Sequence, residues 1–224
     1  MKHTLIFSMS LALAATGYAG TATISGSASI LDANDSGGSD IPLDALVLFV
    51  VETASSGTIA DLVASNGVSI ANGTSLAVGN TFNDYEIIGF TNAPAAGVVG
   101  PGNLLVTVDE PGTEANAGDP FAIIWFGGIT VADGDTAYTV GSADNGADFG
   151  VATVSGNGVD GDPSNAWTLP ASGGTKQFSS NVGSTQLEQV ASAQADKSIT
   201  VIPEPAATAG LLGLAGLFAI RRFR

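Results

Sequence analysis

The residues best suited to chemistry are four oxygen-bearing side chains in the segment LDANDSGGSD, residues 31–40. They surround a Gly-Gly turn, and they are Asp32, Asn34, Asp35 and Asp40. Carboxylate and amide oxygens that alternate around a glycine bend are the ligands that calcium prefers. We therefore treat these four residues as a candidate calcium site, and calcium is the one cofactor that the sequence suggests.

The same segment departs from an EF-hand calcium loop at an important position. Counted from Asp32, the twelfth position is Leu43, where an EF-hand loop needs a bidentate Glu. Two loops of similar composition lie at 133–135 and 157–165. In the alternative interpretation, all three are solvated turns whose Asp and Asn side chains bond to their own backbone.

Residues 1–19 have the three parts of a secretory signal peptide. Lys2 and His3 supply positive charge, residues 5–15 are mostly apolar, and Ala19 ends a small-residue cleavage site. The alternative is a buried terminal strand or helix, but the three parts occur in the order of a signal. We expect export by the Sec machinery and a cut by signal peptidase after Ala19.

Loss of this segment removes His3, the only histidine, from a chain without cysteine. The mature protein then lacks the residues for Ser-His-Asp or Cys-His catalysis and for imidazole or thiolate metal sites. We expect no enzyme. A carboxylate-based glycoside hydrolase is the least favoured alternative, because sugar-facing aromatic residues and charged partners are scarce.

The charge balance excludes nucleic acid as a partner. The chain has 21 acidic and six basic residues, for a net charge of -15. Between residues 4 and 220 the basic side chains are Lys176 and Lys197 alone. Such a chain lacks the cations that displace counterions from a phosphate backbone.

The middle of the chain predicts an all-β fold. Short apolar runs alternate with Asn-Gly and Asp-Gly pairs, which supply the positive φ angles of tight turns. The predicted strands are 21–30, 45–51, 84–90, 103–109, 121–126, 136–140 and 149–154. We expect one β-sandwich domain, jelly-roll-like or immunoglobulin-like, over residues 20–175, with two helical turns at 57–65.

Two of these runs predict central strands. ALVLFVV (45–51) and FAIIWF (121–126) are apolar without alternation, so both of their faces must be covered. We expect Trp167 at one end of the sandwich. The predicted core aromatics are Phe49, Phe90, Phe121, Trp125, Phe126 and Phe149.

Residues 176–202 have the composition of a polar linker. The stretch 184–198 is compatible with a helix or with an extended spacer. After it, residues 206–220 are uncharged and are followed by three arginines, Arg221, Arg222 and Arg224. The arginines would stay in the cytoplasm and fix the orientation of a short transmembrane helix. A plain type I membrane anchor explains these features, but it gives no reason for Pro203-Glu204-Pro205.

The tail from 203 to 224 resembles the PEP-CTERM sorting signal of Gram-negative bacteria. Pro203, Glu204 and Pro205 match its motif, residues 206–220 match its hydrophobic helix, and the arginines match its basic end. The resemblance implies a substrate of exosortase, a membrane-embedded transpeptidase-like enzyme that recognises residues 203–205. It also implies passage through the inner membrane to the cell surface or extracellular matrix, where family members accompany exopolysaccharide and biofilm production.

The expected function is therefore that of an exported surface protein with a structural or adhesive role, in which extracellular polysaccharide is a candidate partner. The resemblance does not cover the β domain. A carbohydrate-binding or calcium-binding module remains the alternative for that part of the chain.

Overall fold

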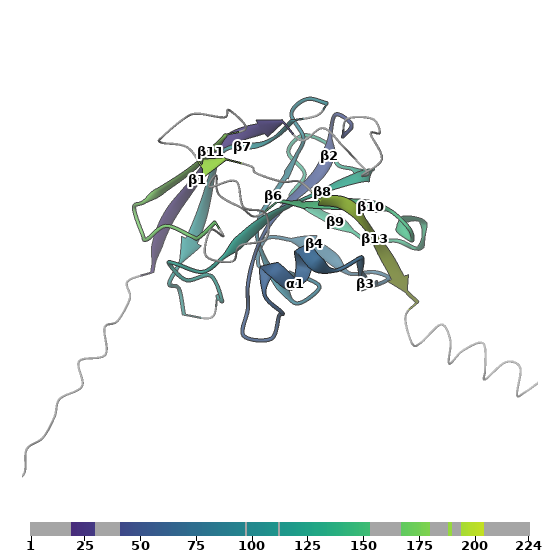
Figure 1. The fold of residues 1–224 in the computed structure, drawn as a ribbon, viewed down its shortest axis with the longest axis horizontal. Coiled ribbons are helices and arrows are strands. Elements are labelled where there is room, and N and C mark those ends of the chain that lie inside the picture. The colour runs from purple at the N-terminus through teal and green to yellow at the C-terminus, as the bar shows by residue number, and fades with distance from the viewer. Residues whose placement is uncertain are drawn as a thin grey trace, which may run out of the picture.

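The computed structural model describes residues 19–29, 41–96, 98–111, 113–152, 167–179, 188–189 and 194–203. These residues form an all-β fold with one short helix, as the sequence predicts (Figure 1). The elements of the first half are β1 (Gly20–Ser29), β2 (Ala45–Val51), α1 (Ile59–Ala64), β3 (Gly67–Ala71), β4 (Ser75–Ala77), β5 (Thr81–Phe82), β6 (Tyr85–Asn92) and β7 (Val98–Val108). Those of the second half are β8 (Phe121–Thr130), β9 (Ala137–Thr139), the 3-10 turn η1 (Ser142–Asp144), β10 (Asp148–Ala152), β11 (Thr175–Ser179), β12 (Glu188–Gln189) and β13 (Gln194–Ile202).

The strands form two main sheets. A four-stranded sheet has the order β12-β11-β1-β7, and a seven-stranded sheet has the order β3-β13-β10-β8-β2-β6-β5. Strands β4 and β9 form a separate antiparallel pair. All seven strands predicted from the sequence are present, although their ends differ by up to five residues.

The first core fills the space between the two sheets. Ala22, Ile24, Val106 and Val108 of the four-stranded sheet belong to the same buried cluster as Val47, Phe49 and Trp125 of the larger sheet. Trp167 joins this core and is fully buried, with its ring 5.6 Å from that of Phe121. The sandwich prediction is therefore confirmed.

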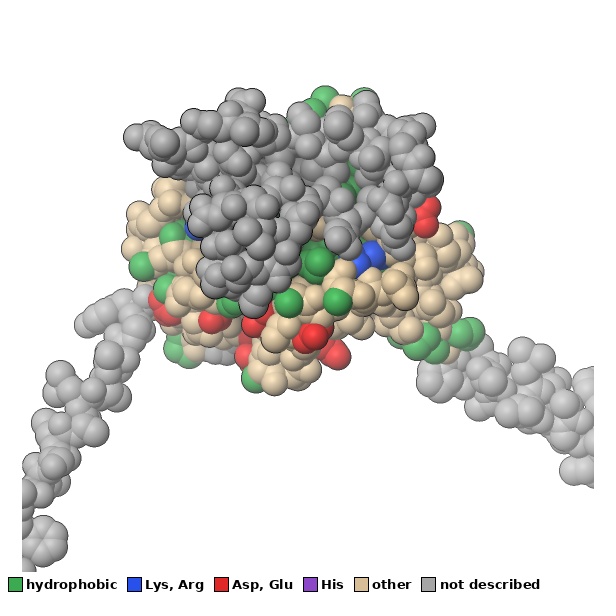
Figure 2. All heavy atoms as spheres, viewed as in Figure 1, with side chains coloured by type: hydrophobic (Ala, Val, Ile, Leu, Met, Phe, Trp, Pro, Cys, Tyr) green, Lys and Arg blue, Asp and Glu red, His purple; other side chains and the backbone are tan. Residues whose placement is uncertain are grey.

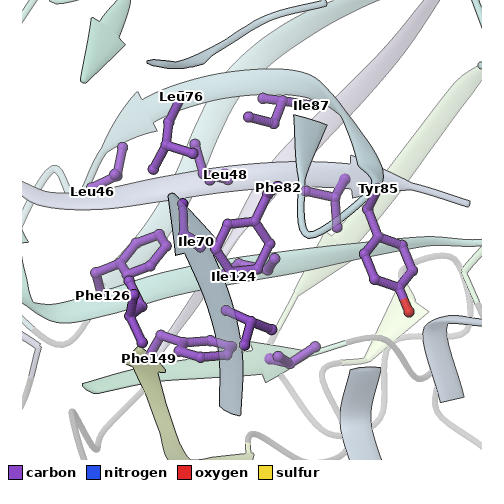
Figure 3. Packing of buried hydrophobic residues seen from close by; sticks show 14 of the residues in the cluster. Leu46, Leu48, Ile70, Leu76, Phe82, Tyr85, Ile87, Ile124, Phe126 and Phe149 are labelled. Carbon is purple, nitrogen blue, oxygen red and sulfur yellow. The ribbon is translucent and has the colours of Figure 1, made fainter. Parts of the chain in front are cut away.

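A second core covers the other face of the seven-stranded sheet. Leu46, Leu48 and Val50 of β2 lie in it, together with Ile59 and Leu62 of α1. Figure 3 shows side chains of β2, β3, β4 and β8 converging there. Because β2 lies between two cores, every residue of ALVLFVV is buried, as its continuous apolar pattern predicts.

Three phenylalanines occupy the middle of this second core. Phe82 meets Phe126 and Phe149 edge-on, at ring separations of 5.8 and 5.6 Å. Phe82 was not among the predicted core residues, because the flanking sequence NTFND has no apolar pattern. Phe90, which was predicted to be in the core, is only partly buried and packs at its margin.

The helix α1 is stabilised at its first turn by a capping box. Thr58 accepts a hydrogen bond from the Asp61 amide, and the Asp61 carboxylate accepts one from the Thr58 amide. This reciprocal pair satisfies two backbone donors that a helix start leaves open. The two predicted helical turns at 57–65 are therefore confirmed.

The domain continues past its predicted end at residue 175. Strand β13 pairs with β10 on one side and with β3 on the other. The interpretation of 176–202 as a polar linker is thus wrong for residues 194–202, which are not helical. It is also wrong for 176–179 in β11 and for 188–189 in β12, which extend the four-stranded sheet beside β1. The sequence QADKSITVI alternates apolar and polar residues only in its second half, and tertiary pairing supplies the partners that a linker would lack.

Candidate functional site

Most of the predicted site residues lie outside the described part of the chain. These are Asp32, Asn34, Asp35, Asp40, Glu204, Pro205, Arg221, Arg222 and Arg224. The predicted processing points Ala19 and Pro203 are both described, and both are exposed. Ala19 directly precedes β1, and Pro203 directly follows β13.

Strand β13 is held firmly up to its last residue. The amide of Asn72 donates to the carbonyl oxygen of Ile202 at 2.8 Å. The amide of Val201 donates to Oδ1 of Asn145 at 2.9 Å. The folded domain therefore continues to the residue before Pro203, which cannot itself donate a backbone hydrogen bond.

Lys197 fixes the middle of the same strand. Its side chain is only 3% exposed, and its ammonium group donates to the carbonyl oxygens of Val63 and Ser65 at the end of α1. A cation at this position satisfies carbonyls that a helix end leaves open and complements the helix dipole. Burial of Lys197 was not predicted, because the residue lies in a polar stretch of the sequence.

We name the surface where the chain leaves the sheet the exit corner, and define it as Ala71, Asn72, Gly73, Asn145 and Ile202. The first three belong to a turn in which the Thr74 amide donates to the Ala71 carbonyl and Gly73 has a φ of 86°. None of the five is charged, and Ile202 is 49% exposed. In Figure 1, β13 ends beside β3 at the lower right.

A second surface carries a group of carboxylates, which we name the carboxylate rim: Glu52, Asp61, Asp84, Glu86 and Glu114. Glu52 accepts from the Ile59 amide at 2.6 Å, and Glu86 accepts from the Glu114 amide at 2.7 Å. These bonds tie the ends of β2 and β6 to α1 and to the 113–119 loop. Acidic side chains are visible at several places along the lower edge of the face in Figure 2.

The rim and the exit corner lie at opposite ends of the seven-stranded sheet. Each of the pairs β2–β8, β8–β10 and β10–β13 is antiparallel. Strands β2 and β13 therefore run in opposite directions. Glu52 follows the end of β2, whereas Ile202 is the end of β13. Seven residues of β2 at about 3.3 Å each place the two surfaces roughly 20 Å apart along the strands.

The rim changes the acidity of Tyr85. Burial is the main factor that raises the pKa of its hydroxyl to about 12, and neighbouring negative charges add to the effect. Those charges belong to Asp61, Glu52 and Asp84. The hydroxyl donates to the Thr58 carbonyl at 2.8 Å. The pKa of Asp61 is lowered, mainly by its hydrogen bond from the Thr58 backbone.

The described acidic turns support their own backbones. Asp135 accepts from the Ala132 amide at 2.8 Å, so the 133–135 loop follows the solvated-turn interpretation. Asp119 and Asp144 accept from the amides of Asn116 and Gly141 in the same way. Among the residues that the structure describes, no three His, Cys, Asp or Glu side chains form a group that could hold a metal ion.

The membrane helix predicted at 206–220 also lies outside the described ranges. Within them, no helix is long and apolar enough to cross a membrane. Comparison of the chain with models of protein families, with curated proteins and with solved structures finds no match.

Proposed function

We propose that the chain is an exported surface or matrix protein that is sorted and processed at Pro203-Glu204-Pro205 by an exosortase. The observation that carries this proposal is the order of features at the C-terminus: the motif, fifteen uncharged residues from 206 to 220, and three arginines. The expected export signal at residues 1–19 agrees with it.

The geometry of β13 supports the same proposal. A processing enzyme needs an accessible peptide segment, and Pro203 is exposed immediately after the last strand. The motif therefore starts at the residue that directly follows β13. Once the tail is cut, the β-sandwich keeps both cores, since neither cluster includes a residue beyond Val201.

The mature domain has a structural or adhesive role in this proposal. Its net charge keeps it soluble outside the cell, and its buried aromatic residues are used for packing rather than for ligand contact. The extracellular polysaccharide matrix is the proposed environment. The chain itself is the substrate of the processing reaction.

Replacement of the motif tests the proposal. With Pro203, Glu204 and Pro205 all changed to Ala, we expect the full-length chain to accumulate in the membrane fraction. The matched control changes the exposed pair Glu110-Pro111 to Ala-Ala, and it should be processed like the wild type. Normal processing of the tail variant would refute the proposal.

A further inference from the structure

We infer that, before it is processed, the domain stands on the membrane with its exit corner against the lipid headgroups and its carboxylate rim pointing away. This inference rests on the proposed function, because it takes residues 206–220 as the membrane anchor. It adds an orientation and a contact surface, which the resemblance to sorting signals does not provide.

Chain length sets the first constraint. Three residues separate Ile202 from Ala206, where the apolar run begins. An extended chain spans at most about 3.6 Å per residue, so the Cα atoms of Ile202 and Ala206 are at most about 14 Å apart. The headgroup layer on each side of a bilayer is roughly 5–8 Å thick. The Cα atom of Ile202 therefore lies at most about 6–9 Å above the outer surface of the lipid headgroups.

The short apolar run strengthens this constraint. As a helix, fifteen residues would span about 22 Å, which is less than the roughly 30 Å hydrocarbon core. A short span draws its flanking residues towards the bilayer or thins the bilayer around it. Both responses bring Pro203 closer to the membrane.

Because the exit corner is held rigidly in the sheet, its closeness to the membrane fixes how the domain is oriented. Ile202 is bonded to Asn72, and Val201 is bonded to Asn145, so β13 cannot peel away to act as a spacer without losing these bonds. Ile202 is thus the last residue that these hydrogen bonds hold in the sheet. The surface that surrounds this residue is therefore the one nearest to the lipid.

The charges of the two surfaces favour the same orientation. The five residues of the exit corner are uncharged, and the carboxylates nearest to them in sequence belong to Asp144 and Glu204. The corner should therefore meet less repulsion from anionic headgroups than the rim, which carries five carboxylates. The Asp144 carboxylate accepts hydrogen bonds from the Tyr138 hydroxyl and the Gly141 amide. The rim lies roughly 20 Å away along the strands, more than twice the Debye length of about 8 Å at physiological ionic strength.

Energy transfer between a label on the protein and labelled lipid tests the orientation. The chain has no cysteine, so Ala71→Cys and Ala54→Cys each create a single labelling site. Both alanines are exposed, and Ala54 lies at the rim, where its amide donates to Glu114. Residues 20–224 of each variant would be reconstituted into phosphatidylcholine vesicles with and without phosphatidylglycerol.

We expect transfer to the lipid acceptor to be several-fold stronger from position 71 than from position 54, in both kinds of vesicle. Equal or reversed transfer from a vesicle-bound chain would overturn the orientation and leave the proposed sorting untouched. The vesicles contain no processing enzyme. If the exit corner contacted such an enzyme and not the lipid, transfer from positions 71 and 54 would therefore also be equal. Failure of the chain to associate with vesicles would overturn the anchor, and the inference with it.

A second pair of positions guards against a variant that does not fold. Ser69→Cys lies on the same strand as Ala71, and Ala117→Cys lies in the loop that holds the rim, with its amide bonded to Asp109. Both residues are exposed. The inference requires energy transfer to the lipid acceptor to be stronger from position 69 than from position 117.

Discussion

Asn72 and Ile202 are joined across strands β3 and β13 by a hydrogen bond of 2.8 Å from amide to carbonyl. This bond links the turn after β3 to the last residue before Pro203. Its consequence is that the sheet extends to the residue directly before Pro203, where the proposed sorting motif begins. The hydrogen bonds that hold the end of β13 therefore also determine where the exposed residue Pro203 leaves the sheet.

Truncation should expose this relationship. A chain of residues 20–203 retains β13, and we expect its urea-unfolding midpoint to match that of residues 20–224. A chain of residues 20–175 loses most of β11, which pairs with β1, and all of β13, which pairs with both β3 and β10. We expect it to be unfolded by circular dichroism. A cooperatively folded 20–175 chain would show that β13 is dispensable.

Lys197 should be the more important of the two lysines in the domain. Lys197→Met leaves the Val63 and Ser65 carbonyls without this donor in a buried site, so we expect a loss of about 2–3 kcal/mol in the free energy of unfolding. Lys176 is partly exposed, and Lys176→Met should cost less than about 1 kcal/mol. Equal losses in urea titrations would contradict the role assigned to Lys197.

Gly150 should tolerate no side chain. A Cβ atom there would lie 2.1 Å from a ring carbon of Trp125, which is itself fully buried. We expect Gly150→Ala to destabilise the domain by at least about 2 kcal/mol, the usual range for overpacking. Gly128→Ala has open space at the same atom and serves as the control, with a change near zero. Calorimetric melting of both variants makes the comparison.

Tyr85 should make stability fall at alkaline pH. Its pKa is raised from about 10 to about 12 in the folded protein. The native state therefore keeps a proton that the unfolded chain loses. The contribution of this raised pKa to the free energy of unfolding is fully present below pH 10 and is lost as the pH rises towards 12.

The variant Tyr85→Phe separates this effect from the hydrogen bond to Thr58. At pH 8 the free energy of unfolding of Tyr85→Phe should be about 1 kcal/mol lower than that of the wild type, because the hydrogen bond to the Thr58 carbonyl is lost. Between pH 10 and 12 the free energy of unfolding of the variant should fall less steeply than that of the wild type. Tyr138 also has a pKa of about 12, raised by burial and by Asp144, so part of the wild-type slope should remain. Identical slopes in urea titrations would contradict the assignment to Tyr85.

The sequence predicted the parts of the fold that depend on local pattern. The continuous apolar runs of β2 and β8 identified the two central strands, because a strand covered on both faces has no polar side. The stretch GTIADLVAS indicated the two helical turns of α1. Each of these signals is contained within a few consecutive residues.

The parts that were missed depend on distant partners. Strand β13 contains Lys197, which is polar by composition and becomes compatible with burial only through carbonyls more than 130 residues earlier. The burial of Phe82 depends on Phe126 and Phe149 in the same way. The rim was missed because its carboxylates come from separate parts of the chain, including α1, β6 and the loops beside them, which no spacing in the sequence connects.

Intact mass spectrometry of the protein from its native surface fraction tests the central claim most directly. The account predicts a chain that begins near Gly20 and ends after Ile202, within the tail, so that β13 remains whole. Any additional mass would report the group that replaces the tail. A chain that ends at Arg224 would contradict the proposed processing, and one that ends before Ile202 would contradict the claim that processing leaves the fold intact.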